Sequence, residues 1–218
     1  MTRAEALKRG YTDGARRIAS RSMVSLARTR VTPNALTATG VTLCGVAAAI
    51  VFFENRNEIL FYWLGALVFV VGSILDILDG ALARTSGKGT PFGAFLDSTT
   101  DRVSEGFMLG AIALVFARNH ELVGVGLTFA GVAGSFLVSY TRARAEALGL
   151  KGDVGIGSRA ERVVVITTGL VFAPWGVLPY AIGFLTATAW FTVGQRVWSV
   201  RRQLRQRADA AVREDADA

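Results

Sequence analysis

Four aspartates stand close together in the stretch DILDGALARTSGKGTPFGAFLDSTTDR, which covers residues 76–102 and lies between apolar segments. Asp76 and Asp79 are three residues apart, and Asp97 and Asp101 are four apart, so each pair shares one face of a helix. Carboxylates this close repel one another, and the two arginines of the stretch are too few to neutralise them. Divalent cations are the simpler compensation, because Mg²⁺ and Mn²⁺ suit all-oxygen sites.

The residues between the aspartates suit a phosphate ligand. Gly80 has no side chain and lets a ligand approach the backbone, while Arg84 can bind a phosphate through two N–H groups. Four carboxylates, some of them bridging, are enough for two ions about 3.5–4 Å apart, which can clamp both sides of a phosphoryl transfer. The structural alternative is a metal-free helix pair held by salt bridges.

The composition predicts a membrane protein. Hydrophobic residues make up 51% of the 218 residues, yet the net charge is +7, so apolar and basic residues must be separated along the chain. The one cysteine, Cys44, excludes a disulfide within the chain and a thiolate metal site. Residues 1–31 are basic with scattered apolar positions, which predicts an amphipathic helix at a membrane surface. A nucleic-acid arm is the rival interpretation, but the membrane-like sequence that follows favours no nucleic-acid partner.

The fold class expected is all-α: an integral membrane bundle of six transmembrane helices with an N-terminal amphipathic juxtamembrane helix. A spanning helix needs about 20 mostly apolar residues. The chain then divides into a juxtamembrane segment (1–31), a six-helix membrane domain (32–202) and a polar tail (203–218). The expected spans cover residues 35–53, 59–83, 92–117, 122–140, 159–173 and 177–197.

The basic residues predict the orientation. All but three of the 24 Lys and Arg residues fall on one side of this topology. Arg56 and Arg118 fall on the other side, and Arg102 lies inside the third span. The positive-inside rule then places both termini, and the loops that follow the second and fourth spans, in the cytoplasm at the cell membrane. The four aspartates should meet at one depth, just inside the cytoplasmic surface.

The pattern D-x2-D-G-x2-A-R-x8-G-x3-D-x3-D, from Asp76 to Asp101, resembles the signature of the CDP-alcohol phosphotransferases at every fixed position. The resemblance implies a membrane enzyme that moves a substituted phosphate from a CDP-linked donor to an alcohol and releases CMP. It also implies a homodimer. Because such a site lies at the membrane surface, a lipid donor, CDP-diacylglycerol, can reach it by lateral diffusion.

Roles follow from this resemblance residue by residue. Asp76, Asp79 and Asp97 look like the ligands of one metal, and Asp76, Asp97 and Asp101 like those of a second; both ions are expected to be Mg²⁺, with Mn²⁺ possible. Asp101 corresponds to the general base that removes the proton of the acceptor hydroxyl. The expected contacts of the CDP group are Asn34, Ala35, Leu36, Thr37, Gly80, Arg84 and Thr90.

The acceptor must be inferred from the later helix ends, where arginines converge. They suit an anionic acceptor, although arginines there also serve as ordinary positive-inside anchors. The stretches VSYTRARAEALGLKGDVGIGSRAERVVVI and GQRVW resemble actinobacterial phosphatidylinositol phosphate synthases. Arg142 departs from that pattern, in which a lysine is expected. The acceptor-phosphate residues implied are Ser139, Arg142, Arg162 and Arg196.

The expected reaction is therefore transfer of the phosphatidyl group to a phosphorylated polyol, foremost 1D-myo-inositol 3-phosphate (L-myo-inositol 1-phosphate). A phosphatidylglycerophosphate synthase that uses glycerol 3-phosphate is the nearest alternative, and an ether-lipid donor is another. A cation transporter would also explain buried carboxylates. It would not explain Gly80, Arg84 and Gly93 at their fixed offsets from the aspartates.

Overall fold

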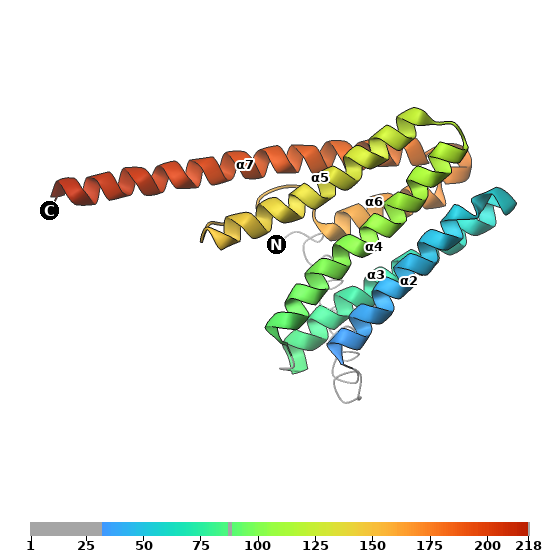
Figure 1. The fold of residues 1–218 in the computed structure, drawn as a ribbon, viewed down its shortest axis with the longest axis horizontal. Coiled ribbons are helices and arrows are strands. Elements are labelled where there is room, and N and C mark those ends of the chain that lie inside the picture. Colours follow the sequence, from blue (N-terminus) through green and yellow to red (C-terminus); the bar gives the residue numbers. More distant parts are fainter. Residues whose placement is uncertain (1–31, 87–88, 218) are drawn as a thin grey trace, which may run out of the picture. The chain divides into compact units, whose positions relative to one another are not determined.

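The computed structural model describes residues 32–86 and 89–217, and every regular element within them is a helix. All six segments expected to span the membrane are helical, which confirms the all-α fold; the proposed N-terminal amphipathic helix lies outside the described residues. The helices of Figure 1 are α2 (Pro33–Phe52), α3 (Glu58–Ser86), α4 (Pro91–Arg118), α5 (Leu122–Ala147), α6 (Arg159–Val171) and α7 (Leu178–Asp217), with short 3₁₀ turns η1 (Glu54–Arg56) and η2 (Ala173–Trp175).

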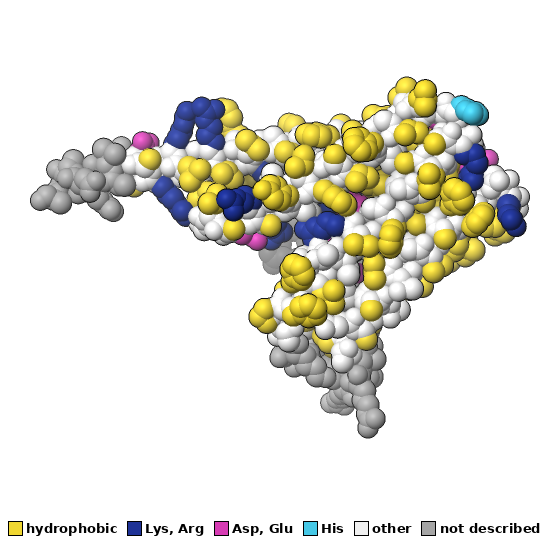
Figure 2. Space-filling model, in the orientation of Figure 1, with side chains coloured by type: hydrophobic (Ala, Val, Ile, Leu, Met, Phe, Trp, Pro, Cys, Tyr) yellow, Lys and Arg dark blue, Asp and Glu magenta, His cyan; other side chains and the backbone are white. Residues whose placement is uncertain are grey.

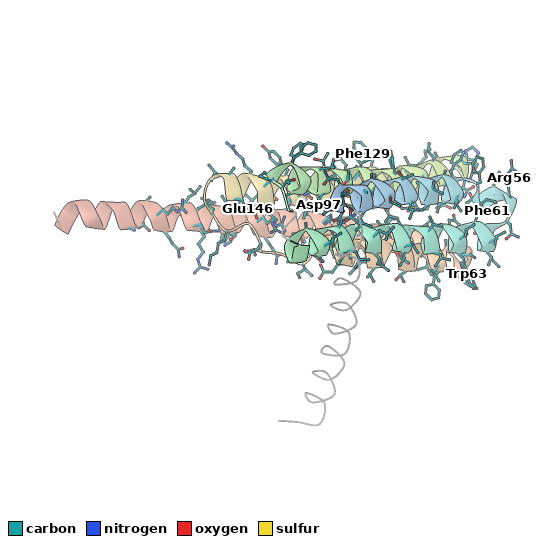
Figure 3. All side chains as sticks on the ribbon, turned by 90° about the horizontal axis from the view of Figure 1, so that it is seen from below. Arg56, Phe61, Trp63, Asp97, Phe129 and Glu146 are labelled. Atoms are coloured by element: carbon teal, nitrogen blue, oxygen red, sulfur yellow. The ribbon has the colours of Figure 1, made fainter. Side chains whose placement is uncertain are left out.

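Within the described residues, three helices are long and apolar enough to cross a membrane: α2, α3 over Glu58–Ala83, and α5. Hydrophobic side chains cover much of the visible surface (Figure 2), and large ones such as Phe129 (76% exposed) and Trp63 (49%) point outward (Figure 3). A soluble monomer rarely exposes this much apolar surface, so lipid is the natural cover. By contrast, α4 begins with polar residues, α6 has 13 residues and α7 ends in a polar half.

The chain forms two compact units, Met1–Cys44 with Val71–Ser104, and Gly45–Val70 with Glu105–Ala218. In the first unit, α2 and α3 approach each other backbone to backbone. A Cβ added at Gly40 would lie 3.0 Å from the carbonyl oxygen of Gly72, and one added at Gly72 would lie 2.9 Å from that of Gly40. Small residues allow such close helix packing in membranes. Asp76 follows Gly72 by one helical turn and is buried.

In the second unit, α5 lies along α7 (Figure 1). Two glycines of α5 make this contact close: Gly131 meets Thr186, and Gly134 meets Ala189. The Thr186 hydroxyl also donates to the carbonyl oxygen of Leu127 at 2.9 Å. Helix α6 packs against the same helix, so α7 contacts both α5 and α6.

Helix α7 continues beyond residue 202 and holds the loop between α5 and α6. The side-chain amide of Gln203 accepts from the backbone nitrogen of Lys151 and donates to its carbonyl oxygen, both at 2.9 Å. Arg207 donates to the carbonyl oxygens of Leu148 and Gly149. The segment expected to be a polar tail from residue 203 is therefore helical as far as Asp217, and its first turns fix the loop.

Candidate functional site

Three of the four aspartates form a cluster in the first unit. Asp76 of α3 and Asp97 and Asp101 of α4 each offer a carboxylate oxygen, and these oxygens lie within 4.8 Å of one another. Asp76 is 4% exposed, while Asp97 and Asp101 are half-buried. Residues from two helices that were expected to meet therefore lie at one place.

The fourth aspartate, Asp79, is buried and is hydrogen-bonded to helix α2. Its Oδ2 accepts a hydrogen bond from the hydroxyl of Thr37, which is itself 3% exposed and also donates to the carbonyl oxygen of Pro33. Thr37 was expected to contact the CDP group. Its hydroxyl also orients a predicted metal ligand, a role that the sequence did not indicate.

A cavity of about 400 Å³ opens beside these carboxylates. Asp79 and Asp97 both line it, so it adjoins the cluster directly. Of the residues expected to hold the CDP group, Asn34, Thr37, Gly80 and Thr90 line the cavity, whereas Ala35 and Leu36 do not. The side chain of Arg84 lies outside the described part of the structure. The remaining lining residues are Pro33, Ala83, Gly89, Pro91, Gly93 and Ala94.

The start of α4 shapes one wall of this cavity. The Thr90 hydroxyl accepts from the backbone nitrogen of Gly93 at 2.9 Å, which is an N-cap contact, and Pro91 occupies the first helical position. A Cβ at Gly93 would lie 3.1 Å from the Thr90 hydroxyl and 3.4 Å from Oδ1 of Asn34. Glycine therefore lets the starts of α2 and α4 approach each other at the cavity.

The predicted acceptor residues lie in the second unit, and Arg162 is the most constrained of them. Its Nε and Nη2 donate to the two carboxylate oxygens of Glu105 at 2.6 and 3.0 Å. Its Nη1 donates to the carbonyl oxygen of Gly157 at 2.6 Å. A capping box between Ser158 and Glu161 fixes the start of α6 and hence the position of Arg162.

Arg196 of α7 is buried and is held by backbone carbonyls. It donates to the carbonyl oxygen of Val154 at 2.9 Å and to that of Val138, which precedes Ser139 on α5. The guanidinium groups of Arg142 and Arg162 lie close enough for their positive charges to repel that of Arg196. The structure therefore gathers the three predicted arginines, with Arg142 on the exposed side.

The carboxylate cluster fits a divalent metal. Three oxygens from separate side chains lie close enough to share one ion, and carboxylates are the ligands that Mg²⁺ and Mn²⁺ prefer. Arg102 lies 3.9 Å from Asp101, donates to the backbone of Ser98 and is partly exposed. The convergence of the three carboxylates thus favours a divalent metal.

Comparison with protein families decides the class of this chain. The model of the CDP-alcohol phosphatidyltransferase family matches residues 30–198, which includes both the aspartate cluster and the arginines.

The chain belongs to the CDP-alcohol phosphatidyltransferase family.

Relatives within the family are similar over most of their length. A phosphatidylinositol phosphate synthase of Mycobacterium marinum is 38% identical over 183 residues, covering 80% of this chain and 76% of the relative. An archaetidylinositol phosphate synthase of Pyrococcus horikoshii is 37% identical over 182 residues, covering 83% and 89%.

Solved structures agree. Phosphatidylinositol phosphate synthase of Mycobacterium tuberculosis with CDP-DAG bound superposes with a TM-score of 0.75 at 32% identity, covering 84% of this chain and 94% of that one. A structure of the same enzyme with manganese and citrate gives a TM-score of 0.71 at 33% identity, covering 84% and 88%. Manganese in a relative agrees with divalent metal at the aspartate cluster of this family member.

Sequence reasoning missed Glu105, the partner of Arg162. The available signal was a lone carboxylate within the apolar half of α4, because an ionisable residue in such a segment needs a partner. Its identity as the partner of Arg162, 57 residues away, depends on packing in the second unit.

Proposed function

We propose that this chain transfers the phosphatidyl group of CDP-diacylglycerol to a phosphorylated polyol, foremost an inositol phosphate, and releases CMP. The observation that carries the proposal is the carboxylate cluster of Asp76, Asp97 and Asp101 beside a cavity of about 400 Å³. Family membership supports the reaction class. The names of the M. marinum and P. horikoshii relatives support an inositol phosphate as acceptor.

Two divalent ions, Mg²⁺ or Mn²⁺, are proposed at the aspartates. Asp76, Asp79 and Asp97 would hold one ion, and Asp76, Asp97 and Asp101 the other. When bound, the ions supply positive charge that offsets the charge of the donor diphosphate and polarises the acceptor hydroxyl. The Thr37 hydroxyl holds the carboxylate of Asp79, a proposed metal ligand, in one orientation.

Asp101 is proposed as the general base. Its carboxylate takes the proton of the acceptor hydroxyl as that oxygen bonds to the phosphorus that carries the diacylglycerol. The bond from this phosphorus to the bridging oxygen breaks, and CMP leaves. A partly buried carboxylate in the metal cluster is suited to hold this proton close to the reacting atoms.

The cytidine diphosphate group is proposed to lie in the cavity of the first unit. Gly80 and Gly93 leave room next to the backbone, and Asn34 and Thr90 offer polar groups along the wall. Ala35, Leu36 and Thr37 are proposed to contact the CDP group from the start of α2. Arg84 is proposed to bind its phosphate.

The acceptor phosphate is proposed to bind Ser139, Arg142, Arg162 and Arg196. Planar guanidinium groups match the oxygens of a phosphate, whereas a neutral alcohol offers them no negative charge to bind. Arg196 supports this proposal most directly, because it is buried among carbonyl groups and near two other cations.

The membrane arrangement is proposed to have six spans, with α4, α6 and α7 joining the three apolar helices. Both termini and the active site would face the cytoplasm, with residues 1–31 as an amphipathic segment, 32–202 as the membrane domain and 203–218 as the tail. A homodimer is proposed as the assembly.

The test is release of CMP from CDP-diacylglycerol by the purified protein with Mg²⁺. The acceptor panel contains inositol 1-phosphate (L-myo form), glycerol 3-phosphate, serine and free inositol, and an ether-linked CDP donor is run in parallel. Release with inositol phosphate alone supports the proposal. Release with glycerol 3-phosphate alone would reassign the acceptor, and no release with any alcohol would sink the enzyme proposal.

A further inference from the structure

The pair of Glu105 and Arg162 is buried on both sides, with each side chain 8% exposed. Two parallel hydrogen bonds join the Nε and Nη2 of Arg162 to the carboxylate. Moving two charges out of water is expensive, and packed hydrophobic residues often stabilise a core as well as such a pair does. A gain in stability alone is therefore a weak explanation for this buried pair.

Glu105 fixes which part of the guanidinium is free for a ligand. An arginine side chain has five N–H donors. Glu105 takes two of them along one edge, and the carbonyl oxygen of Gly157 takes a third. The two remaining N–H groups are on the terminal nitrogens and have fixed directions, since three contacts hold the plane of the group.

The neighbouring arginines are held differently. Arg142 pairs with Glu146 at 2.9 Å on an exposed face, where the side chains are 56% and 54% exposed. Arg196 donates to carbonyl oxygens, and no carboxylate of the described residues lies within salt-bridge distance of it. Glu105 is thus the buried carboxylate of the arginine cluster, and it acts on one member.

We propose that Glu105 is a positioning residue that sets the affinity for the acceptor by holding Arg162 in one orientation. The inference rests on the proposed function, in which Arg162 binds the acceptor phosphate. With the carboxylate in place, the guanidinium presents its two remaining N–H groups to the phosphate. Without it, the group rotates toward other acceptors, and the phosphate loses a preformed partner.

The test compares Glu105→Gln with the wild type in the CMP-release assay, with the acceptor and the donor varied in turn. Glutamine keeps the shape of the side chain but places an amide NH₂ against one guanidinium nitrogen. The acceptor KM is expected to rise about ten- to a hundredfold, with the donor KM nearly unchanged. A purely structural role would lower the melting temperature and leave the acceptor KM where it was.

A double-mutant cycle locates the effect in Arg162. Arg162→Lys keeps the charge but cannot form the two-bonded contact. In that background, Glu105→Gln should change the acceptor KM less than about twofold, because the two-bonded contact through which Glu105 acts is already lost. Additive effects of the two substitutions would overturn the inference.

Glu146→Gln is the matched control, since it removes the carboxylate partner of Arg142 from an exposed pair in the same cluster. Its acceptor KM should stay within about threefold of the wild type. If Glu105→Gln does not fold, Glu105→Asp decides instead, because it keeps the charge and shortens the reach. An unchanged acceptor KM in the folded variant overturns the inference, whereas a wild-type protein inactive with every acceptor overturns the proposed function.

Discussion

The aspartate region and the arginine region of this protein are built in different ways. The four aspartates come from one stretch of residues 76–101, carried by two helices that follow each other along the chain. The arginines come from α5, α6 and α7. The partners that orient them come from α4, from α5 and from the loop between α5 and α6. Local spacing decides the first region, and long-range packing decides the second.

The two regions also differ in the kind of ligand that their charge suits. The carboxylates lie beside a cavity and suit divalent cations. The arginines suit an anionic group, and Glu105, Glu146 and backbone carbonyls hold them in place. Changes in the aspartate region should therefore stop chemistry, while changes in the arginine region should mainly weaken acceptor binding.

The largest expected effect tests the chemical half of this contrast. Asp101→Asn removes the proposed base and a metal ligand, and turnover should fall by about a thousandfold or more. Binding of the donor, measured with a CMP-competition assay, should change little because the cavity residues remain. Turnover near that of the wild type would remove Asp101 as the base.

The second prediction tests the binding half. Arg196→Ala leaves the carbonyl oxygens of Val138 and Val154 without their donor and removes a buried cation, so the acceptor KM should rise about a hundredfold. The donor KM should change less than about threefold. Arg201→Ala, an exposed arginine on the same helix, is the control for general loss of positive charge. An equal loss of donor and acceptor use would indicate a scaffold role for Arg196.

These two regions were also unequally predictable from the sequence. Spacings of three and four residues place each aspartate pair on one helical face, and the expected antiparallel pairing of the two helices brings the pairs to one depth. The sharing of one ion by Asp76, Asp97 and Asp101 was implied by the family resemblance. Glu105 could not be assigned to Arg162, because the pair depends on how α4 and α6 pack within the second unit.

The helices show the same division. Apolar composition predicted all six helical segments. The length that a span needs extended the fifth segment back to Arg159, which is where α6 begins after its cap at Ser158. The length of α7 was not predicted, because its last half is polar and was assigned to a tail. That half is rich in Ala and Arg, which favour helix without any apolar face, and its contacts with the loop at Lys151 add support.

A smaller effect is expected where the aspartate region depends on a neighbour. Thr37→Val keeps the shape of the side chain but removes the hydroxyl that donates to Asp79. The Mg²⁺ concentration for half-maximal activity should rise about fivefold to tenfold, because the ligand is less well oriented. Thr39→Val is the control, since its hydroxyl donates to the backbone of its own helix. An unchanged Mg²⁺ dependence would show that Thr37 does not support the metal site.

The smallest effect is expected where the arginine region depends on α7 beyond the proposed membrane domain. Gln203→Leu removes the two hydrogen bonds to Lys151, and the loop that contains Val154 should then open more often. Amide hydrogen exchange at Lys151 should accelerate about tenfold, whereas the acceptor KM should rise no more than about threefold, because Arg196 still holds Val154. Gln206→Leu changes an exposed glutamine of the same helix and should affect neither quantity. Faster exchange with an unchanged KM would limit the acceptor site to its buried arginines, and unchanged exchange would mean that α7 does not fasten the loop in solution.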